Sequence, residues 1–445
     1  MHAVDTPQLI FGWDPVWFAG SLFVVTYALI MSERINRAIV ATSAAAIMVL
    51  AGVISEQHAV DGVDFNTIGL LTGMMVIVAI TRRSGVFQYL AVWSAKKVKA
   101  QPWGILLMLS LVTAVLSALL DNVTTVLLIA PVTLLITEAL GVKAYPYLFV
   151  EIFASNIGGA ATLIGDPPNI MIGSSVGLSF NDFIVHTAPA AVIVMLVTMV
   201  PVYWIWGRHL HASDESRQRV MNYKEREAIT DKVLLIKSLA VLALVILGFA
   251  LSHFIDKQPS TIALAGAALL LLLDNLGRHA AAQTKSVHAT FAEVEWVTIF
   301  FFVGLFVVVH ALERTGLLTM LAEGILRLTG GDLTVTAMAI LWGSAVASAV
   351  VDNIPFVATT IPLIKSMAPT FGGAENLMPL WWSLALGACL GGNGSLVGAS
   401  ANLIVAGFAE RSQQPIGFLA FTLAAFPLMI LGIAVSSLYI YLRYL

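Results

Sequence analysis

Long apolar segments separated by short polar ones run along the whole chain. Ten of them are long enough, or nearly so, for the roughly 20 residues that a membrane-spanning helix needs. These expected spans are 15–31, 38–54, 66–81, 144–176, 183–206, 233–252, 260–274, 295–312, 378–408 and 415–441. Two other apolar stretches, 103–139 and 333–370, each carry a polar point in the middle. We interpret each as a re-entrant hairpin with the polar point at its tip. The pattern predicts an all-α polytopic membrane protein.

Two of the expected spans are interrupted by helix-breaking and polar residues. Residues 155–169 contain three glycines followed by Pro167 and Pro168, and residues 390–402 form a similar glycine-rich break. Such residues do not continue a straight helix. Unwound backbone at membrane depth survives only where protein or a water-filled cavity satisfies its polar groups. We therefore predict two broken helices, and each break is a candidate site for an ion or a small solute.

The second half of the chain repeats the first. At an offset of 233, Gly158, Gly159, Leu163, Gly165 and Asn169 match Gly391, Gly392, Leu396, Gly398 and Asn402. At an offset of 231, Gly73, Gly85, Asp121, Asn122 and Pro131 match Gly304, Gly316, Asp352, Asn353 and Pro362. Each half then holds five spans, one hairpin and one short surface helix, at 84–98 and 316–329. An odd number of spans per half predicts an inverted-topology repeat, as in many secondary transporters.

This repeat sets the expected domain organisation. Residues 1–207 form the first transmembrane repeat, 208–232 a cytoplasmic linker, and 233–445 the second, inverted repeat. With the N-terminus outside, most of the 23 Lys and Arg residues fall on inner loops, as the positive-inside rule requires. The linker has mixed charge and no motif, so a plain connection is the default interpretation.

The amino-acid composition supports the membrane assignment and argues against several classes of ligand and metal site. Hydrophobic residues make up 59% of the chain and charged residues only 11%, against roughly 25% charged in soluble domains. The net charge of -3 argues against binding to nucleic acid. The single Cys389 excludes intrachain disulfides and cysteine-based metal clusters. We expect neither a cofactor nor a metal centre, and we place the chain in the lipid bilayer of the cell (inner) membrane.

The two hairpin tips and the two breaks carry the candidate binding residues. The set comprises Asp121, Asn122, Thr124, Thr125, Asn156, Thr162, Gly165, Asp166, Asn169, Asp352, Asn353, Asn393, Ser395, Ser400 and Asn402. Carboxylates, amides and hydroxyls at membrane depth mark ion or solute sites. No Lys or Arg lies near these four elements in the sequence. The site is therefore expected to favour a cation, a proton or a neutral hydroxylated solute over a highly charged anion.

Structural roles compete with these assignments. Asp is a preferred helix N-cap, so Asp121 and Asp352 could cap a helix, bind a ligand, or do both. Asp166 precedes two prolines, as an N-cap often does, yet its depth in the membrane favours a functional role.

The glycines are expected to serve close packing more than solute contact. Glu151 could carry a proton or extend to the inner surface, and we prefer the second reading. Cys389 is expected to be a small packed residue.

At these residues the chain resembles a known family. Asp121-Asn122 with Pro131, the run 164–169, residues 352–355 and residues 390–402 resemble the arsenite permease and pink-eyed-dilution P protein family of the ion transporter superfamily. The resemblance covers about residues 15–441, and the run 164–169 is more similar to the P protein branch. It implies a fixed scaffold part and a transport part, made of hairpins and broken helices, that moves across the membrane.

The expected function is secondary active transport by alternating access. The leading substrate is arsenite or antimonite, extruded from the cytoplasm in exchange for protons. Undissociated arsenite is a neutral trihydroxide that amides and hydroxyls would suit, and Asp121, Asp166 or Asp352 could carry the coupling proton. A sodium/proton antiporter on the same fold is the main alternative, and an intramembrane aspartyl protease is a remote one. The family resemblance also allows an ATPase partner, and the chain could form a homo-oligomer.

Overall fold

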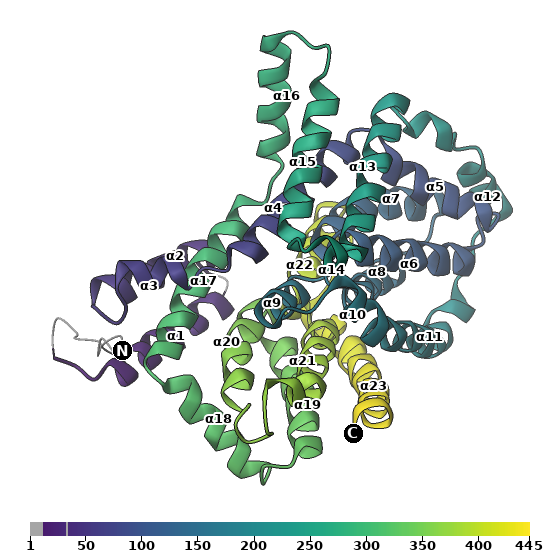
Figure 1. Cartoon of the computed structure of the whole chain (residues 1–445). Coiled ribbons are helices and arrows are strands. Elements are labelled where there is room, and N and C mark those ends of the chain that lie inside the picture. The colour runs from purple at the N-terminus through teal and green to yellow at the C-terminus, as the bar shows by residue number, and fades with distance from the viewer. Residues whose placement is uncertain (1–11, 33) are drawn as a thin grey trace.

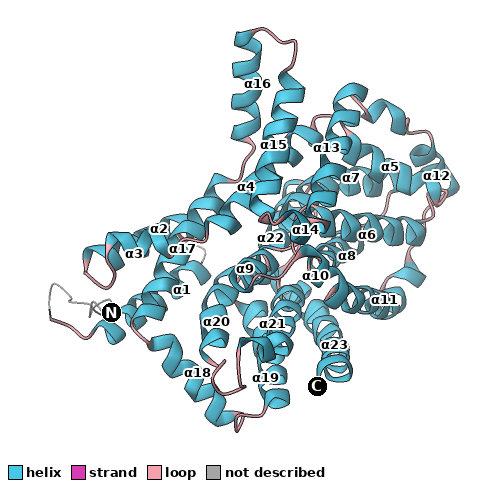
Figure 2. Cartoon of the chain, in the orientation of Figure 1, coloured by secondary structure: helices cyan, strands magenta, loops and turns pink. Residues whose placement is uncertain are grey.

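The computed structural model describes residues 12–32 and 34–445. Figures 1 and 2 show that this part of the chain consists of helices joined by loops, and no strand occurs in it. The first expected repeat begins at residue 1, so residues 1–11 of it and Glu33 lie outside the described ranges. The all-α fold expected from the apolar pattern is confirmed.

One group of helices, the paired bundle, is built from both halves of the chain. It contains α1 (Pro15–Met31), α2 (Arg37–Leu50), α3 (Glu56–Asp61), α4 (Phe65–Arg82), α13 (Lys232–Ala250), α14 (Ser252–Ile255), α15 (Pro259–Asn275), α16 (Ala280–Ala292) and α17 (Trp296–Arg314). The halves exchange partners, because α4 packs on α15 whereas α17 packs on α2. Both contacts are made at matching glycines. A Cβ on Gly73 would lie 2.7 Å from the backbone of Ala263, and one on Gly304 would lie 2.6 Å from the backbone of Ala41.

The other group, the hairpin bundle, holds both hairpins and both broken helices. Its first half contains α6 (Pro102–Leu119), α7 (Asn122–Leu140), α8 (Tyr145–Gly159), α9 (Pro167–Val176), α10 (Phe180–His186) and α11 (Ala188–Ile205). Its second half contains α19 (Leu333–Val350), α20 (Asn353–Ser366), η3 (Ala374–Leu377), α21 (Met378–Gly391), η4 (Gly392–Gly394), η5 (Leu396–Gly398), α22 (Ser400–Arg411) and α23 (Phe418–Tyr444). In Figure 1 the two halves interleave at the centre of the molecule, around α8, α9, α21 and α22.

Helix length alone does not separate spans from hairpins. Eight helices in the described residues are long and apolar enough to cross a membrane, and they include the hairpin arms α6, α7 and α19. The position of the hairpin tip relative to the neighbouring helix distinguishes a re-entrant hairpin from two membrane-spanning helices. The backbone N–H of Asn122, at the tip of the first hairpin, donates to the carbonyl of Gly165 in the middle of the broken helix α8–α9. The first hairpin therefore reaches only halfway along its neighbour, as a re-entrant hairpin does.

The linker is more ordered than a plain connection. It forms η1 (Gly207–His209), α12 (Asp214–Met221) and η2 (Glu225–Ala228), and it packs on α7 and on the surface helix α5 (Val86–Lys97). Lys96 donates to Glu225 at 2.5 Å, and this hydrogen bond holds the pKa of Glu225 below its usual range. The counterpart of α5 is α18 (Leu317–Leu328), which packs on α17 and α20.

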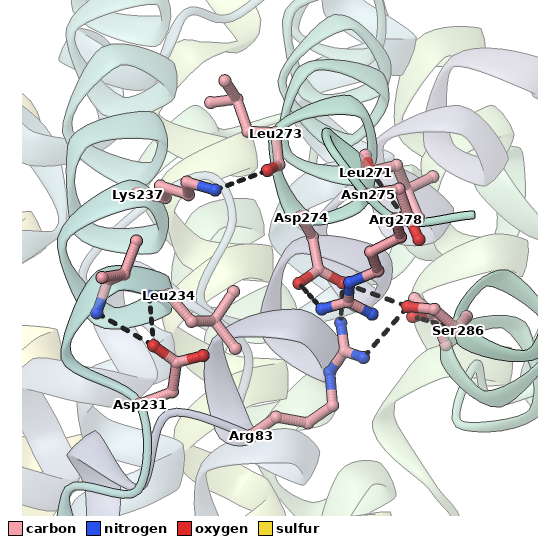
Figure 3. Close-up of polar contacts among 12 residues, drawn as sticks. Arg83, Asp231, Leu234, Lys237, Leu271, Leu273, Asp274, Asn275, Arg278 and Ser286 are labelled. Carbon is pink, nitrogen blue, oxygen red and sulfur yellow. Dashed lines mark hydrogen bonds and ion pairs between the residues drawn. The ribbon is translucent and has the colours of Figure 1, made fainter. Parts of the chain in front are cut away.

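A polar cluster fixes one end of the paired bundle. Figure 3 shows the buried carboxylate of Asp274 between Arg83 and Arg278, at 2.7 and 2.8 Å, with Ser286 at 3.1 Å. These contacts join the end of α4 to α15 and to α16. Because α16 is only moderately apolar, the hydrophobic pattern did not predict it. The cluster explains why this helix stays against α15 and α4.

Candidate functional site

The two breaks have the same internal construction. Asn169 donates to the carbonyls of Gly159 and Thr162, at 3.2 and 2.9 Å. Its counterpart Asn402 donates to the carbonyls of Gly392 and Ser395, at 2.7 and 2.8 Å. Where a helix is interrupted, its last carbonyls have no helical N–H partner. The two amides therefore stabilise the unwound segments by satisfying the carbonyls that the breaks release.

Two of the candidate hydroxyls tie the breaks to the hairpins. Thr162 donates to the carbonyl of Ala118 and Ser395 to that of Ala349, both at 2.5 Å. Both acceptors lie near the end of the hairpin arm that leads to the tip. Each hydroxyl donates to a backbone carbonyl of its own half, so Thr162 and Ser395 join the breaks to the hairpins.

Gly165 also serves packing, as expected for the glycines. A Cβ on Gly165 would lie 2.6 Å from the carbonyl oxygen of Gly159 and 2.7 Å from that of Ser117. Its own carbonyl accepts from Asn122 at the hairpin tip. Only a residue without a side chain allows the tip and the break to approach this closely.

Four buried amides from both halves meet between the breaks. Asn122 donates to Asn156 at 3.3 Å, and Asn156 donates to Asn393 and Asn402, both at 3.0 Å. Two atoms beside this amide cluster have no hydrogen-bond partner although they are buried, namely the side-chain oxygen of Asn122 and the hydroxyl of Thr125. Leaving such groups unpaired is costly. They are available to a bound solute or ion.

The carboxylate of Asp166 is fully buried and lies at the contact between the two halves. Asp166 is the N-cap residue of α9, but its side chain makes no capping hydrogen bond. Instead, both carboxylate oxygens accept from the amide of Asn353, at 3.3 and 3.2 Å. Cys389, the repeat counterpart of Asn156, donates to Asn169 at 3.5 Å, one helical turn from Asp166. Cys389 is buried as expected, and it packs against the site.

Asp121 caps the helix that follows it. Its carboxylate accepts from the backbone N–H of Thr124 at 2.7 Å and from the Thr124 hydroxyl at 2.6 Å. The capping role considered for Asp121 is thus confirmed, and Thr124 is part of that cap. Neither side chain hydrogen bonds to the amide cluster or to Asp166.

Asp352 also caps the helix that follows it, accepting from the backbone N–H of Ile354 at 3.3 Å, but it has in addition a basic partner that the sequence did not reveal. Arg37 on α2 donates to Asp352 at 2.8 Å and to Ser400 at 2.5 Å, and Ser400 donates to Asp352 at 2.7 Å. The same guanidinium donates to Thr298 at 3.3 Å and lies 5.1 Å from the ring centre of Phe301. The expectation of a site without basic residues is therefore wrong at this tip. It failed because Arg37 is distant in the sequence and reaches the tip from the paired bundle.

Arg37, Asp352 and Ser400 line a cavity of about 310 Å³ between the two bundles. A second cavity, of about 230 Å³, is lined by Asn66, Ile170 and residues of the loop before α15. Ile170 is the repeat counterpart of Leu403, which lines the first cavity. One cavity therefore lies beside each broken helix.

Glu151 is not at a surface. It is 1% exposed, and one of its oxygens accepts from the hydroxyl of Thr133. The preferred interpretation, in which Glu151 extends to the membrane surface, is therefore wrong. Helix α8 is buried over its whole length between other helices of the hairpin bundle.

The arrangement offers amide, hydroxyl and carboxylate oxygens at a helix break, with one buried carboxylate shared between the halves. Such a site suits a proton, a small cation or a neutral hydroxylated solute. Within the described residues, no group of three or more His, Cys, Asp or Glu side chains could hold a metal ion.

Comparisons with known proteins agree with a transporter fold. The profile of the CitMHS family, described as citrate transporter, matches residues 27–387. The uncharacterized transporter Rv2684 of Mycobacterium tuberculosis is 44% identical, over 96% of this chain and 98% of its own length. The human P protein is 33% identical over 96% of this chain, which spans 59% of that relative. The solved YdaH transporter of Alcanivorax borkumensis has a TM-score of 0.62 at 13% identity, over 97% of this chain and 98% of that one.

These findings confirm the P protein part of the expected resemblance, whereas the arsenite permease part stays an expectation. The likeness to the YdaH transporter concerns the fold alone. A family profile that matches most of the chain and relatives this similar over nearly its full length identify a multi-pass membrane transporter. The chain belongs to the CitMHS family of transporters.

Proposed function

We propose that this protein is a secondary active transporter that exports arsenite or antimonite in exchange for protons, with Asp166 as the coupling group. The observation that carries the proposal is the contact of Asp166 with Asn353. A buried carboxylate whose partner is a neutral amide of the opposite half can exist charged or protonated, and the change alters the contact between the halves. A group of this kind can link proton binding to a rearrangement of the two halves within the hairpin bundle.

The substrate part of the proposal rests on the amide cluster. Arsenite at neutral pH is an uncharged trihydroxide, so it needs hydrogen bonds that replace its water and no cationic partner. The oxygen of Asn122 and the hydroxyl of Thr125 are unpaired and buried beside three further amides. Arg37 is the one basic side chain that hydrogen bonds to a candidate site residue in the described part of the chain, and Asp352 neutralises it.

The family name raises citrate as another substrate. A tricarboxylate needs basic side chains with free donors, and the paired guanidinium of Arg37 is a poor match. We therefore consider citrate a less suitable substrate than arsenite.

A sodium/proton antiporter is the second candidate function. It is favoured by the charge of Asp166 together with the carbonyls of the breaks, because carboxylate and carbonyl oxygens are the ligands of a hard cation. Sodium and a proton would then compete for the same carboxylate. In either case we expect the protein to work in the cell membrane. A homo-oligomer remains an expectation, as does an ATPase partner, which the family resemblance allows.

Everted membrane vesicles that are acid inside test the proposal. The expected result is accumulation of arsenite or antimonite that a protonophore abolishes and that Asp166→Asn vesicles lack. Citrate uptake in place of arsenite uptake would contradict the substrate. A sodium-dependent pH change without arsenite uptake would replace the proposal with the antiporter.

A further inference from the structure

A second buried carboxyl group lies in the hairpin bundle, away from the amide cluster. The hydroxyl of Thr133 on α7 donates to one oxygen of Glu151 on α8. The other oxygen of Glu151 has no hydrogen-bond partner. Glu151 is 1% exposed and Thr133 is fully buried. The transport mechanism proposed above does not use this pair.

The repeat shows that the fold does not need a polar pair at this place. The alignment of α8 with α21 runs without a gap from Pro146 and Pro379 to Gly158 and Gly391. In the second half, Leu384 stands where the first half has Glu151, and Ile364 stands where it has Thr133. Both of these apolar residues are fully buried. The same packing position is thus filled by an apolar pair in one half and by a hydroxyl and a carboxyl in the other.

Keeping the polar pair lowers stability. A buried polar group without a hydrogen-bond partner destabilises a protein, and an unpaired buried charge does so far more strongly. No Lys, Arg or His nitrogen in the described part of the chain lies within 4.0 Å of the Glu151 carboxylate. The surroundings therefore accommodate the protonated, neutral form of Glu151 in this conformation.

Few charged or titratable side chains lie on the helices around Glu151. The ionisable side chains on the helices packed against α8 are Tyr203 on α11, Glu138 on α7, Cys389 on α21, and Glu410 and Arg411 on α22. None of them hydrogen bonds to Glu151. One carboxyl and one hydroxyl supply too few oxygens for a sodium ion, which leaves a proton as the ligand.

A second buried hydroxyl lies on the same face of α7 as Thr133. Thr137 lies one turn beyond Thr133, is fully buried, and donates to the carbonyl of Thr133 at 2.9 Å. Its counterpart in the second half is Ala368. The polar residues Glu151, Thr133 and Thr137 therefore occur together in the first half and are all replaced by apolar residues in the second.

We infer that Glu151 is a second proton-binding site of this transporter, loaded along the Thr133–Thr137 face of α7. The inference rests on the proposed proton coupling and adds to it, because the hairpin bundle would then carry a proton at Glu151 in addition to the one at Asp166. The proton neutralises the Glu151 carboxylate, so the group carries no charge in a bundle that must cross an apolar environment.

Infrared difference spectroscopy on the purified full-length protein tests this without any substrate. We expect the acid-minus-alkaline spectrum to contain a carbonyl band of a protonated carboxylic acid. The other carboxyl groups, Asp166 among them, contribute bands of their own, so the diagnostic component is the one that Glu151→Gln removes and Asp166→Asn leaves. In transport vesicles, Glu151→Gln should also shift the pH profile of uptake.

The double variant Thr133→Ile/Glu151→Leu is the folding control, because it copies the second half of the chain. It should melt at the same temperature as the wild type or a higher one, and it should lack the band. A band that does not titrate, or that survives in both variants, would overturn the inference. Wild-type vesicles that move no protons would refute the proposed function, whereas a titrating Glu151 band would still uphold the proton site.

Discussion

The side-chain amide of Asn353 donates to both carboxylate oxygens of Asp166, at 3.3 and 3.2 Å, although 187 residues separate them in the sequence. Asn353 lies at the tip of the second hairpin and Asp166 in the break of the first half. The repeat counterpart of Asp166 is Ala399, so the second half has no equivalent carboxylate. The contact makes Asp166 the point at which a change of charge affects both halves.

Asp166→Asn should fold and reach the membrane but lose coupled transport. Asn keeps the size of the side chain and removes the charge, and no capping hydrogen bond is lost because Asp166 makes none. We expect a fall of at least about tenfold in proton-coupled uptake, or about 1.4 kcal/mol. Uptake assays with a quantitative blot for protein level check this. Normal transport by the variant would show that the charge is not needed.

Arg37→Ala should weaken transport by disturbing the contact between the bundles. The change removes the partner of Asp352 and leaves a largely buried carboxylate unpaired. We expect this to destabilise the conformation by about 1–2 kcal/mol, a roughly five- to thirty-fold change in its population. Adding Asp352→Asn should restore part of the loss, because the uncompensated charge disappears. Uptake rates of the two single variants and the double variant measure the coupling. Purely additive losses would contradict a functional ion pair.

Gly165→Ala should reduce the amount of folded protein. Its Cβ would lie less than 3 Å from the backbone of Gly159 and Ser117, and overpacking of this kind costs about 1–3 kcal/mol. Gly343→Ala in α19 is the matched control, because the space around Gly343 is open. Melting of both variants in detergent provides the comparison. Equal melting temperatures would mean that the hairpin tip and the break are not packed as described.

Opposite orientation of the two halves can be tested by labelling. Lys97 at the end of α5 and Leu328 at the end of α18 are repeat counterparts, and both are exposed. An impermeant thiol reagent should modify Lys97→Cys from the inner side and Leu328→Cys from the outer side. The wild type, with only the buried Cys389, serves as the unlabelled control. Labelling of both positions from one side would disprove the inverted repeat.

The sequence predicted the breaks, the hairpin tips and the repeat because helix-breaking residues and a constant spacing between matching residues can be recognised without knowing the tertiary structure. It did not predict the pairing of α4 with α15 and of α17 with α2, which depends on tertiary packing. Arg37 was missed for the same reason, since 315 residues separate it from Asp352. The burial of Glu151 was also missed, because an apolar segment does not show whether a given face meets lipid or protein.

The most direct test of proton-coupled arsenite export is proton movement driven by arsenite alone. Proteoliposomes carrying an internal pH dye, with the membrane potential clamped, receive arsenite on the outside only. The interior should become alkaline as arsenite enters, in wild-type vesicles and not in Asp166→Asn or protein-free vesicles. Arsenite entry without alkalinisation, or alkalinisation driven by sodium and not by arsenite, would contradict proton-coupled arsenite export.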